Sequence, residues 1–364
     1  MGARVLVLWA NGESSNLGVR VLGDGAAALA RRAWGNDSTV DFQSFEFGPL
    51  GTQLSGKIVL RGLLTGSRAL SRRMSMYDAV IDTGAGDSFT DIYGLKRLAI
   101  MYYTRHVAKR AGVPVVLGPQ TIGPFKSFLG RAAAKRTLRD ARTVMARDST
   151  SATFAAELGR DVDCLATDVV FSLPTPPESS EATSDVVLNV SGLLWSTDTH
   201  GSSAAYQELT RQVIQGCLAA NRRVTLMAHV IDNPSVDNDL QAIRPLIAEF
   251  GDAVEVFIPK ELSEVRSFIS GSNIVIGARM HACLNALSLG KPAIPLAYSR
   301  KFAPLLADIG WPYTIELNSD SAIADRVLAL ISDDRLLAEA KQVRDNANSR
   351  LENAASHLAD QVQV

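Results

Sequence analysis

The sequence predicts an α/β protein built from two doubly wound, Rossmann-like domains. Short apolar runs alternate with segments of helical spacing along the whole chain, which is typical of parallel sheets flanked by helices. Three prolines with serine and glutamate at residues 174–184 break the composition, and the alternation restarts after them. The length of 364 residues also fits two domains of about 100–200 residues each. We therefore expect domains at residues 1–175 and 185–364.

Composition indicates an ordinary soluble protein. The hydrophobic content is 46%, the charged content is 21% and the net charge is −1, which argues against a nucleic-acid partner. Cys164, Cys217 and Cys283 stand alone without a CxxC pair, so neither a disulfide framework nor a metal site is expected. The apolar run at residues 5–9 is too short for a signal peptide or a membrane span. We expect a cytoplasmic protein, with the inner face of the membrane as a second expected location.

A glycine-rich turn follows the predicted strand at residues 77–84. It reads Gly84-Ala-Gly-Asp87 and resembles a dinucleotide fingerprint, but Phe89 occupies the position of the third glycine. An NAD site is therefore not expected. The glycines let a ligand approach the backbone, with Gly86 and Asp87 beside it. The alternative for Asp87 is a helix N-cap.

Two further turns of the first domain carry polar side chains. The loop at residues 118–124 contains Gln120 and two prolines, and Pro124 stands where a P-loop would have its lysine. Arg147 ends the predicted strand at residues 143–146, and Asp148 is placed to cap the following helix. In parallel sheets these turns meet at one edge.

The second domain is predicted to carry an anion site after its fourth strand. Arg279 and His281 begin the helix that follows the apolar run at residues 274–276, where backbone N–H groups and the helix dipole favour an anion. Tyr298 and Lys301 follow the next strand. The alternative is structural: Arg279 pairs with a neighbouring domain and His281 packs as a neutral side chain.

Other polar features of this domain have simpler explanations. His229 ends the predicted strand at residues 223–229, and the acidic cluster at residues 237–239 lacks metal-ligand spacing. We expect that cluster to cap the next helix.

The region from residue 48 to residue 76 is basic and irregular. It carries Lys57, Arg61, Arg68, Arg72 and Arg73. A solvated helix face is the default interpretation. A groove edge that faces an anionic or lipid-linked acceptor is the alternative.

Several stretches together resemble the polysaccharide pyruvyl transferase family. In family order they are Gly84-Ala-Gly-Asp87, Gly118-Pro-Gln-Thr-Ile-Gly-Pro124, Arg147-Asp-Ser-Thr-Ser151, Thr167-Asp168, Asn189-Val-Ser-Gly192, residues 229–239 and residues 263–301 with Arg279-Met-His281. The resemblance implies a GT-B-like pair of domains facing across a cleft. It also implies transfer of pyruvate from phosphoenolpyruvate onto two hydroxyls of one sugar, giving a cyclic ketal and phosphate.

The resemblance also implies roles for the residues singled out above. His281 is the acid–base candidate, Asp87 the base for the acceptor, and Arg279 with Arg147 the anion ligands. The remaining expected substrate-binding residues are Gly86, Gln120, His229, Tyr298 and Lys301. No cofactor is expected. The expected partners are phosphoenolpyruvate and a sugar acceptor on a glycan or glycolipid, with peripheral membrane association through that acceptor.

Two other functions share the predicted architecture. A GT-B glycosyltransferase that uses a nucleotide sugar would need a ribose-binding carboxylate, and Glu261 is a candidate for it. A non-catalytic binding protein of a glycan-assembly complex would need no acid–base group at all.

Overall fold

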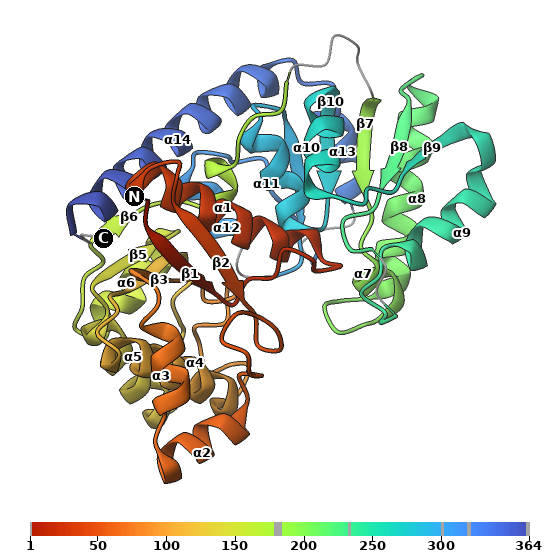
Figure 1. Ribbon diagram of the computed structural model, residues 1–364. Coiled ribbons are helices and arrows are strands. Elements are labelled where there is room, and N and C mark those ends of the chain that lie inside the picture. The colour runs from red at the N-terminus through yellow and green to blue at the C-terminus, as the bar shows by residue number, and fades with distance from the viewer. Residues whose placement is uncertain (1, 178–183, 232–233, 300–301, 319–321, 362–364) are drawn as a thin grey trace. The chain divides into compact units, whose positions relative to one another are not determined.

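The computed structural model of the chain describes residues 2–177, 184–231, 234–299, 302–318 and 322–361 (Figure 1). The chain divides into two compact units. Unit 1 comprises Met1–Glu13, Leu22–Leu173 and Asn348–Val364, and unit 2 comprises Ser14–Val21 and Pro174–Ala347. Each unit contains one six-stranded parallel sheet, so the predicted fold class of two doubly wound α/β sheets is confirmed.

The sheet of unit 1 has the strand order β2-β1-β3-β4-β5-β6. Its strands are β1 Arg4–Leu8, β2 Thr39–Gln43, β3 Ala79–Asp82, β4 Val115–Gln120, β5 Thr143–Ala146 and β6 Cys164–Leu165. The strand order changes direction between β1 and β3, where Val5 pairs with Ala79. Such a switch point is where doubly wound sheets bind ligands.

The helices of unit 1 follow from amphipathic spacing and local caps. They are α1 Leu17–Trp34, α2 Gly56–Thr65, α3 Arg68–Met74, α4 Leu95–Arg110, α5 Phe128–Asp140 and α6 Ser149–Glu157, with a 3-10 turn at Val169–Ser172. Asp148 accepts a hydrogen bond from the Ser151 N–H and caps α6, as predicted. The basic region predicted as irregular contains α2 and α3.

The sheet of unit 2 has the order β12-β11-β10-β7-β8-β9, which is the Rossmann order. Its strands are β7 Ser184–Asn189, β8 Val224–Met227, β9 Val254–Phe257, β10 Ser272–Gly277, β11 Ala293–Ala297 and β12 Ile315–Glu316. The switch point lies between β7 and β10, where Asn189 pairs with Gly277. These strands are mostly buried on both faces, which explains their apolar sequences.

The helices of unit 2 cover this sheet. They are α7 Gly192–Ser196, α8 Ser203–Ala219, α9 Leu240–Phe250, α10 Leu262–Ser270, α11 Met280–Ser288, α12 Phe302–Asp308, α13 Ile323–Ile331 and the first part of α14 Arg335–Gln361, with a 3-10 turn at Gly251–Ala253. The sequence patterns did not predict α12, which is only seven residues long. The first residues of α1 also belong to unit 2, and the end of α14 belongs to unit 1.

A buried ion pair stabilises the switch point of unit 1. The Asp82 carboxylate ends β3 and accepts bonds of 2.6 and 2.8 Å from the Arg105 guanidinium. It also accepts a bond of 2.7 Å from Trp9 Nε1 and one of 2.8 Å from the Gly84 N–H. Because the side chains of Asp82 and Arg105 are at most 5% exposed, loss of one partner would leave the other charge buried.

Replacing Arg105 with Met should therefore lower the free energy of unfolding by about 3–5 kcal/mol. The matched control is Lys109→Met on the same helix, because Lys109 forms a surface pair with Asp140. That control should cost less than about 1 kcal/mol. Chemical denaturation of both variants measures the difference, and equal losses would contradict the role of the buried pair.

Candidate functional site

The Asp239 carboxylate is the polar centre of the switch point in unit 2. Its Oδ2 accepts the backbone N–H groups of His229 and Val230, both at 2.9 Å. Its Oδ1 accepts the Gly192 N–H at 3.0 Å and the Arg279 guanidinium at 2.7 Å. The Asp239 side chain is fully buried. One carboxylate therefore connects the turns that follow β7, β8 and β10.

The prediction that the cluster at residues 237–239 caps the next helix is confirmed for Asn238 and wrong for Asp239. Asp239 occupies the N-cap position of α9, but its side chain makes no capping hydrogen bond. Asn238 Oδ1 instead accepts the Leu240 N–H at 3.0 Å. The prediction failed for Asp239 because sequence spacing does not show which distant donors reach a carboxylate.

The Arg279 side chain is held by two carboxylates. Besides Asp239, it contacts Asp237 through a 2.6 Å bond to Oδ1 and a 2.5 Å bond to the main-chain oxygen. Its own N–H donates to Asn189 Oδ1 at 3.2 Å. Burial alone would lower the pKa of Arg279, but the two carboxylates raise it above its ordinary value. Arg279 therefore fixes the start of α11 to the end of β7 and to the turn before α9.

Two histidines lie near this ion pair. His229 follows β8 and is almost fully buried, and its Nε2 has no hydrogen-bond partner among the described residues. Burial, with the nearby charges of His281 and Arg279, lowers the pKa of His229 to about 3. His229 is thus neutral at neutral pH. His281 is the second residue of α11 and is partly exposed.

The segment before α1 lies against His281 and His229 within unit 2. Leu17 N–H donates to the His229 carbonyl at 3.1 Å, and Asn16 forms a bridge with Val230. A Cβ atom on Gly18 would lie 2.8 Å from His281 Nδ1, so the histidine ring occupies the space that glycine leaves. The sequence patterns did not place Asn16 and Gly18 at this site. The only signal was the Asn-x-Gly spacing at residues 16–18.

In unit 1 the glycine-rich turn lies against Gln120. Gly84, Ala85 and Gly86 have φ values of 59°, 48° and 81°, which favour glycine. A Cβ atom on Gly84 would lie 1.9 Å from Gln120 Oε1. That oxygen is buried without a hydrogen-bond partner among the described residues, while Gln120 Nε2 donates to the Asp82 carbonyl at 2.9 Å.

Asp87 does not cap a helix. The next helix, α4, begins at Leu95 after Gly94. Asp87 Oδ2 instead accepts a 3.0 Å bond from the Tyr93 hydroxyl, and Asp87 remains partly exposed. The N-cap alternative is therefore wrong, and the carboxylate stays at the carboxyl edge of the sheet.

Arg147 is the most deeply buried cation of unit 1. Its side chain is 1% exposed, and its NH1 donates to Asp168 at 3.1 Å. Its Nε also lies 3.9 Å from Asp148 Oδ2, and neither Nε nor NH2 has a hydrogen-bond partner among the described residues. The Arg147 N–H donates to the Gln120 carbonyl at 3.3 Å, so both residues meet at the ends of β4 and β5. A buried guanidinium with open donors is suited to bind an anion.

The structure thus gathers the predicted residues into two sets. His229, Arg279 and His281 lie together in unit 2, and Gly86, Asp87, Gln120 and Arg147 lie at the sheet edge of unit 1. The Tyr298 ring lies against the His200 ring, with centroids 4.9 Å apart and the ring planes tilted by 54°. Lys301 lies outside the described residues.

The carboxylate considered for a ribose also has a partner. Glu261 Oε2 accepts a bond from Arg20 at 2.8 Å, and the Glu261 side chain is 64% exposed. This surface pair joins the first turn of α1 to the start of α10.

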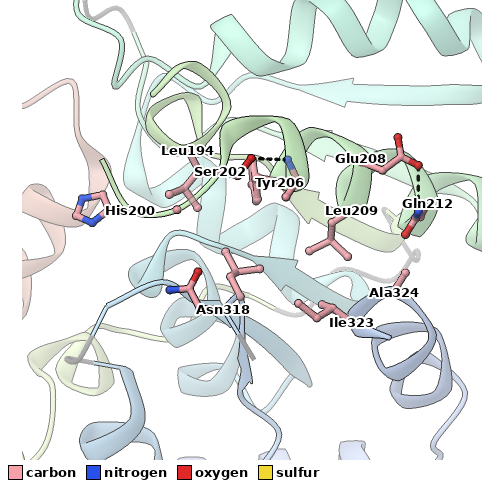
Figure 2. A pocket seen from close by; sticks show the side chains of 13 residues that line it. Leu194, His200, Ser202, Tyr206, Glu208, Leu209, Gln212, Asn318, Ile323 and Ala324 are labelled. Carbon is pink, nitrogen blue, oxygen red and sulfur yellow. Dashed lines mark hydrogen bonds between the residues drawn. The ribbon is translucent and has the colours of Figure 1, made fainter. Parts of the chain in front are cut away.

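A pocket of about 350 Å³ lies beside α8 in unit 2. Figure 2 shows Leu194, Leu209 and Ile323 at its middle, with His200 at one end and Gln212 at the other. None of the predicted substrate-binding residues lines it. The pocket is therefore separate from the residues predicted to bind substrate.

The sequence of the chain matches a known protein family over most of its length. Residues 21–300 match the model of the polysaccharide pyruvyl transferase family, and this range is more than half of the chain. The chain therefore belongs to that family, as its motifs indicated. No curated protein sequence matches the chain.

Solved structures identify the fold as GT-B. A UDP complex of MnaA from S. aureus has a TM-score of 0.61 at 11% identity, covering 98% of this chain and 96% of that one. A putative UDP-N-acetylglucosamine 2-epimerase from Listeria monocytogenes has the same score and identity, covering 98% and 94%. MurG from Acinetobacter baumannii has a TM-score of 0.51 at 14% identity, covering 99% of both chains. At such identities the likeness shows the fold alone.

Two features are absent from the described residues. No group of three or more His, Cys, Asp or Glu side chains in the described ranges could hold a metal ion. Within the same ranges, no helix has the length and the apolar composition that crossing a bilayer requires.

The buried neutral histidine predicts a specific pH dependence. Below about pH 6.5 the unfolded chain protonates His229, whereas the native chain does so only near pH 3. Acidification should therefore destabilise the native state, by about 2 kcal/mol from this group between pH 6.5 and pH 5. Denaturation curves of the parent and of His229→Gln should diverge by that amount on acidification, and parallel losses would contradict the buried neutral state.

Proposed function

We propose that the protein transfers pyruvate from phosphoenolpyruvate onto two hydroxyls of one sugar and releases phosphate. The product is a cyclic ketal on a polysaccharide or glycolipid. The observation that carries this proposal is the position of His281. In a chain of this family, a partly exposed histidine lies at the amino end of α11, at the switch point of the sheet in unit 2.

Unit 2 is proposed to bind the donor. Phosphoenolpyruvate carries a phosphate and a carboxylate, and the positive end of the helix dipole at the start of α11 favours such an anion. Arg279 keeps that helix terminus in place through Asp237 and Asp239, so we propose a positioning role for it. Tyr298 and Lys301, which follow β11 in the sequence, complete the proposed donor set.

The proposed chemistry begins with proton transfer from His281 to the methylene carbon of the donor. This step makes C2 electrophilic, and a sugar hydroxyl attacks it. The C2–O bond to phosphate then breaks, and the second hydroxyl closes the ring. The two hydroxyl protons balance the proton gained by the methyl group and the proton gained by the phosphate.

Unit 1 is proposed to serve the acceptor. Asp87 is partly exposed at the carboxyl edge of the sheet, and its Oδ2 accepts a bond from the Tyr93 hydroxyl. A partly exposed carboxylate at this edge is suited to accept a hydroxyl proton. The open Nε and NH2 of Arg147 are proposed to bind an anionic group of a substrate, with Gln120 and Gly86 beside them. No cofactor is needed in this scheme.

Incubation with phosphoenolpyruvate and a panel of cell-envelope glycans and glycolipids tests the reaction. We expect phosphate release together with a new ketal methyl signal in the NMR spectrum. Two outcomes would overturn the proposal. Turnover of a nucleotide sugar instead would indicate a glycosyltransferase, in line with the UDP named for the MnaA structure. Glycan binding without any turnover would indicate a binding protein.

His281→Gln should lower kcat by about 10²–10⁴ while phosphoenolpyruvate still binds, because general acid catalysis is worth that much. The matched control is His106→Gln on α4 of unit 1, which lies outside the proposed site. Turnover of the control should equal that of the parent. An unchanged kcat in His281→Gln would remove the histidine from the mechanism.

Gly18→Ala should lower kcat at least tenfold, because the added methyl group would stand 2.8 Å from His281 Nδ1 and displace the ring. Gly12→Ala is the control, since its methyl group would meet Phe42 at an ordinary 3.5 Å. Steady-state kinetics and thermal melting of both variants distinguish a loss of activity from a loss of stability. A normal kcat with a lowered melting temperature would assign Gly18 a structural role only.

A further inference from the structure

Residues 47–76 of unit 1 carry charge of only one sign. They contain Lys57, Arg61, Arg68, Arg72 and Arg73 and no Asp or Glu. The whole chain has a net charge of −1, so the remaining residues together carry −1 − 5 = −6. A positive region on a negative protein is a local feature that favours an anionic partner.

The solvent face of α2 combines these cations with leucines. Lys57, Leu60, Arg61 and Leu64 stand at helical positions i, i+3, i+4 and i+7, so they share one face. Leu60 is 60% exposed and Leu64 is 76% exposed. The other face, with Ile58, packs against the core of unit 1. The exposed leucines therefore do not contribute to the core that holds the helix. Their exposure to water is unfavourable in free energy, and burial against a partner would remove that cost.

A hollow of about 550 Å³ lies between α2 and α3. Four cations line it, and no Asp or Glu is among its lining residues. These cations are Lys57, Arg61, Arg68 and Arg73. In the part of the chain that the structure describes, Lys57 and Arg68 form no salt bridge. The hollow is large enough for a phosphate-bearing head group and has the charge to hold one.

A second apolar patch adjoins the first at the amino ends of α4 and α5. Its exposed members are Ile92, Tyr93, Leu95, Phe128 and Leu129, of which Phe128 is 84% exposed. Asp91 joins the two turns by accepting the N–H groups of Lys126 and Ser127. The start of α2 reaches this patch, because a Cβ atom on Gly56 would lie 3.3 Å from Lys96 Cε. Figure 1 shows α2, α3, α4 and α5 together at one end of unit 1.

We propose that this end of unit 1 binds the surface of an anionic phospholipid bilayer. Surface cations attract anionic lipids, and the exposed leucines and aromatic rings enter the boundary between head groups and acyl chains. A second copy of the chain is a poor occupant, because a symmetric contact would place like charges against each other. The inference is independent of the proposed reaction, since binding to vesicles needs neither donor nor acceptor.

Co-sedimentation of the full chain with vesicles tests the proposal. We expect binding to vesicles that contain phosphatidylglycerol and at least tenfold weaker binding to vesicles of phosphatidylcholine alone. Binding should weaken when the salt concentration rises from 0.1 M to about 0.5 M, because salt screens surface charges. Binding of inorganic pyrophosphate without any vesicle binding would reduce the hollow to a small-anion site and overturn the proposal.

Two sets of variants separate charge from apolar insertion. The triple variant Lys57→Gln, Arg61→Gln, Arg68→Gln should lose vesicle binding at least tenfold. Its control, Arg244→Gln, Arg326→Gln, Lys341→Gln, changes three exposed cations of unit 2 and should bind as the parent does.

The double variant Leu60→Ser, Leu64→Ser should also lose binding, whereas Ile247→Ser, Ile258→Ser, at exposed positions of unit 2, should not. All four variants change exposed side chains, and unchanged melting temperatures would show that they fold. Equal losses in the variants and their controls would contradict a binding surface at this end of unit 1.

Discussion

The ion pair between Asp239 and Arg279 is the interaction on which the site in unit 2 depends. Both side chains are nearly inaccessible to water, so each charge needs the other to remain in the interior. Through this pair and its backbone donors, Asp239 joins the turns after β7, β8 and β10. The amino end of α11, with His281 on its first turn, is thereby held rigidly at the switch point, as the proposed role of His281 as a general acid requires.

Unit 1 uses the same principle with different residues. Asp82 ends β3 and binds Arg105, Trp9 and the Gly84 N–H, so a buried carboxylate again fixes a glycine-rich turn. Next to that turn, Gln120 and Arg147 keep buried polar atoms that no described residue of the protein satisfies. Buried donors and acceptors of this kind are rare in structural positions and are typical of binding sites. In each unit, one buried carboxylate therefore fixes the turns at the switch point, and other polar groups nearby are positioned to bind a ligand.

Sequence patterns predicted the architecture well because buried parallel strands and their helices have clear periodicities. The strand at residues 143–146 and the cap formed by Asp148 agree with the structure. Two things could not be predicted. The partner of Asp239 lies 40 residues away, and only the fold brings Arg279 to it. Gly18 lies beside His281, and Asn16 forms a bridge with Val230, although more than 200 residues separate the partners in each pair. No local pattern in the sequence reveals these contacts.

In the proposed reaction, a histidine held at the start of α11 protonates the methylene carbon of phosphoenolpyruvate. The most direct measurement is the isotope content of the product formed in D₂O, read by NMR or mass spectrometry. If the methylene carbon is protonated in this way, each ketal methyl group should contain one deuterium, and product and phosphate should form in equal amounts. A methyl group without deuterium, or a product formed without phosphate release, would contradict it.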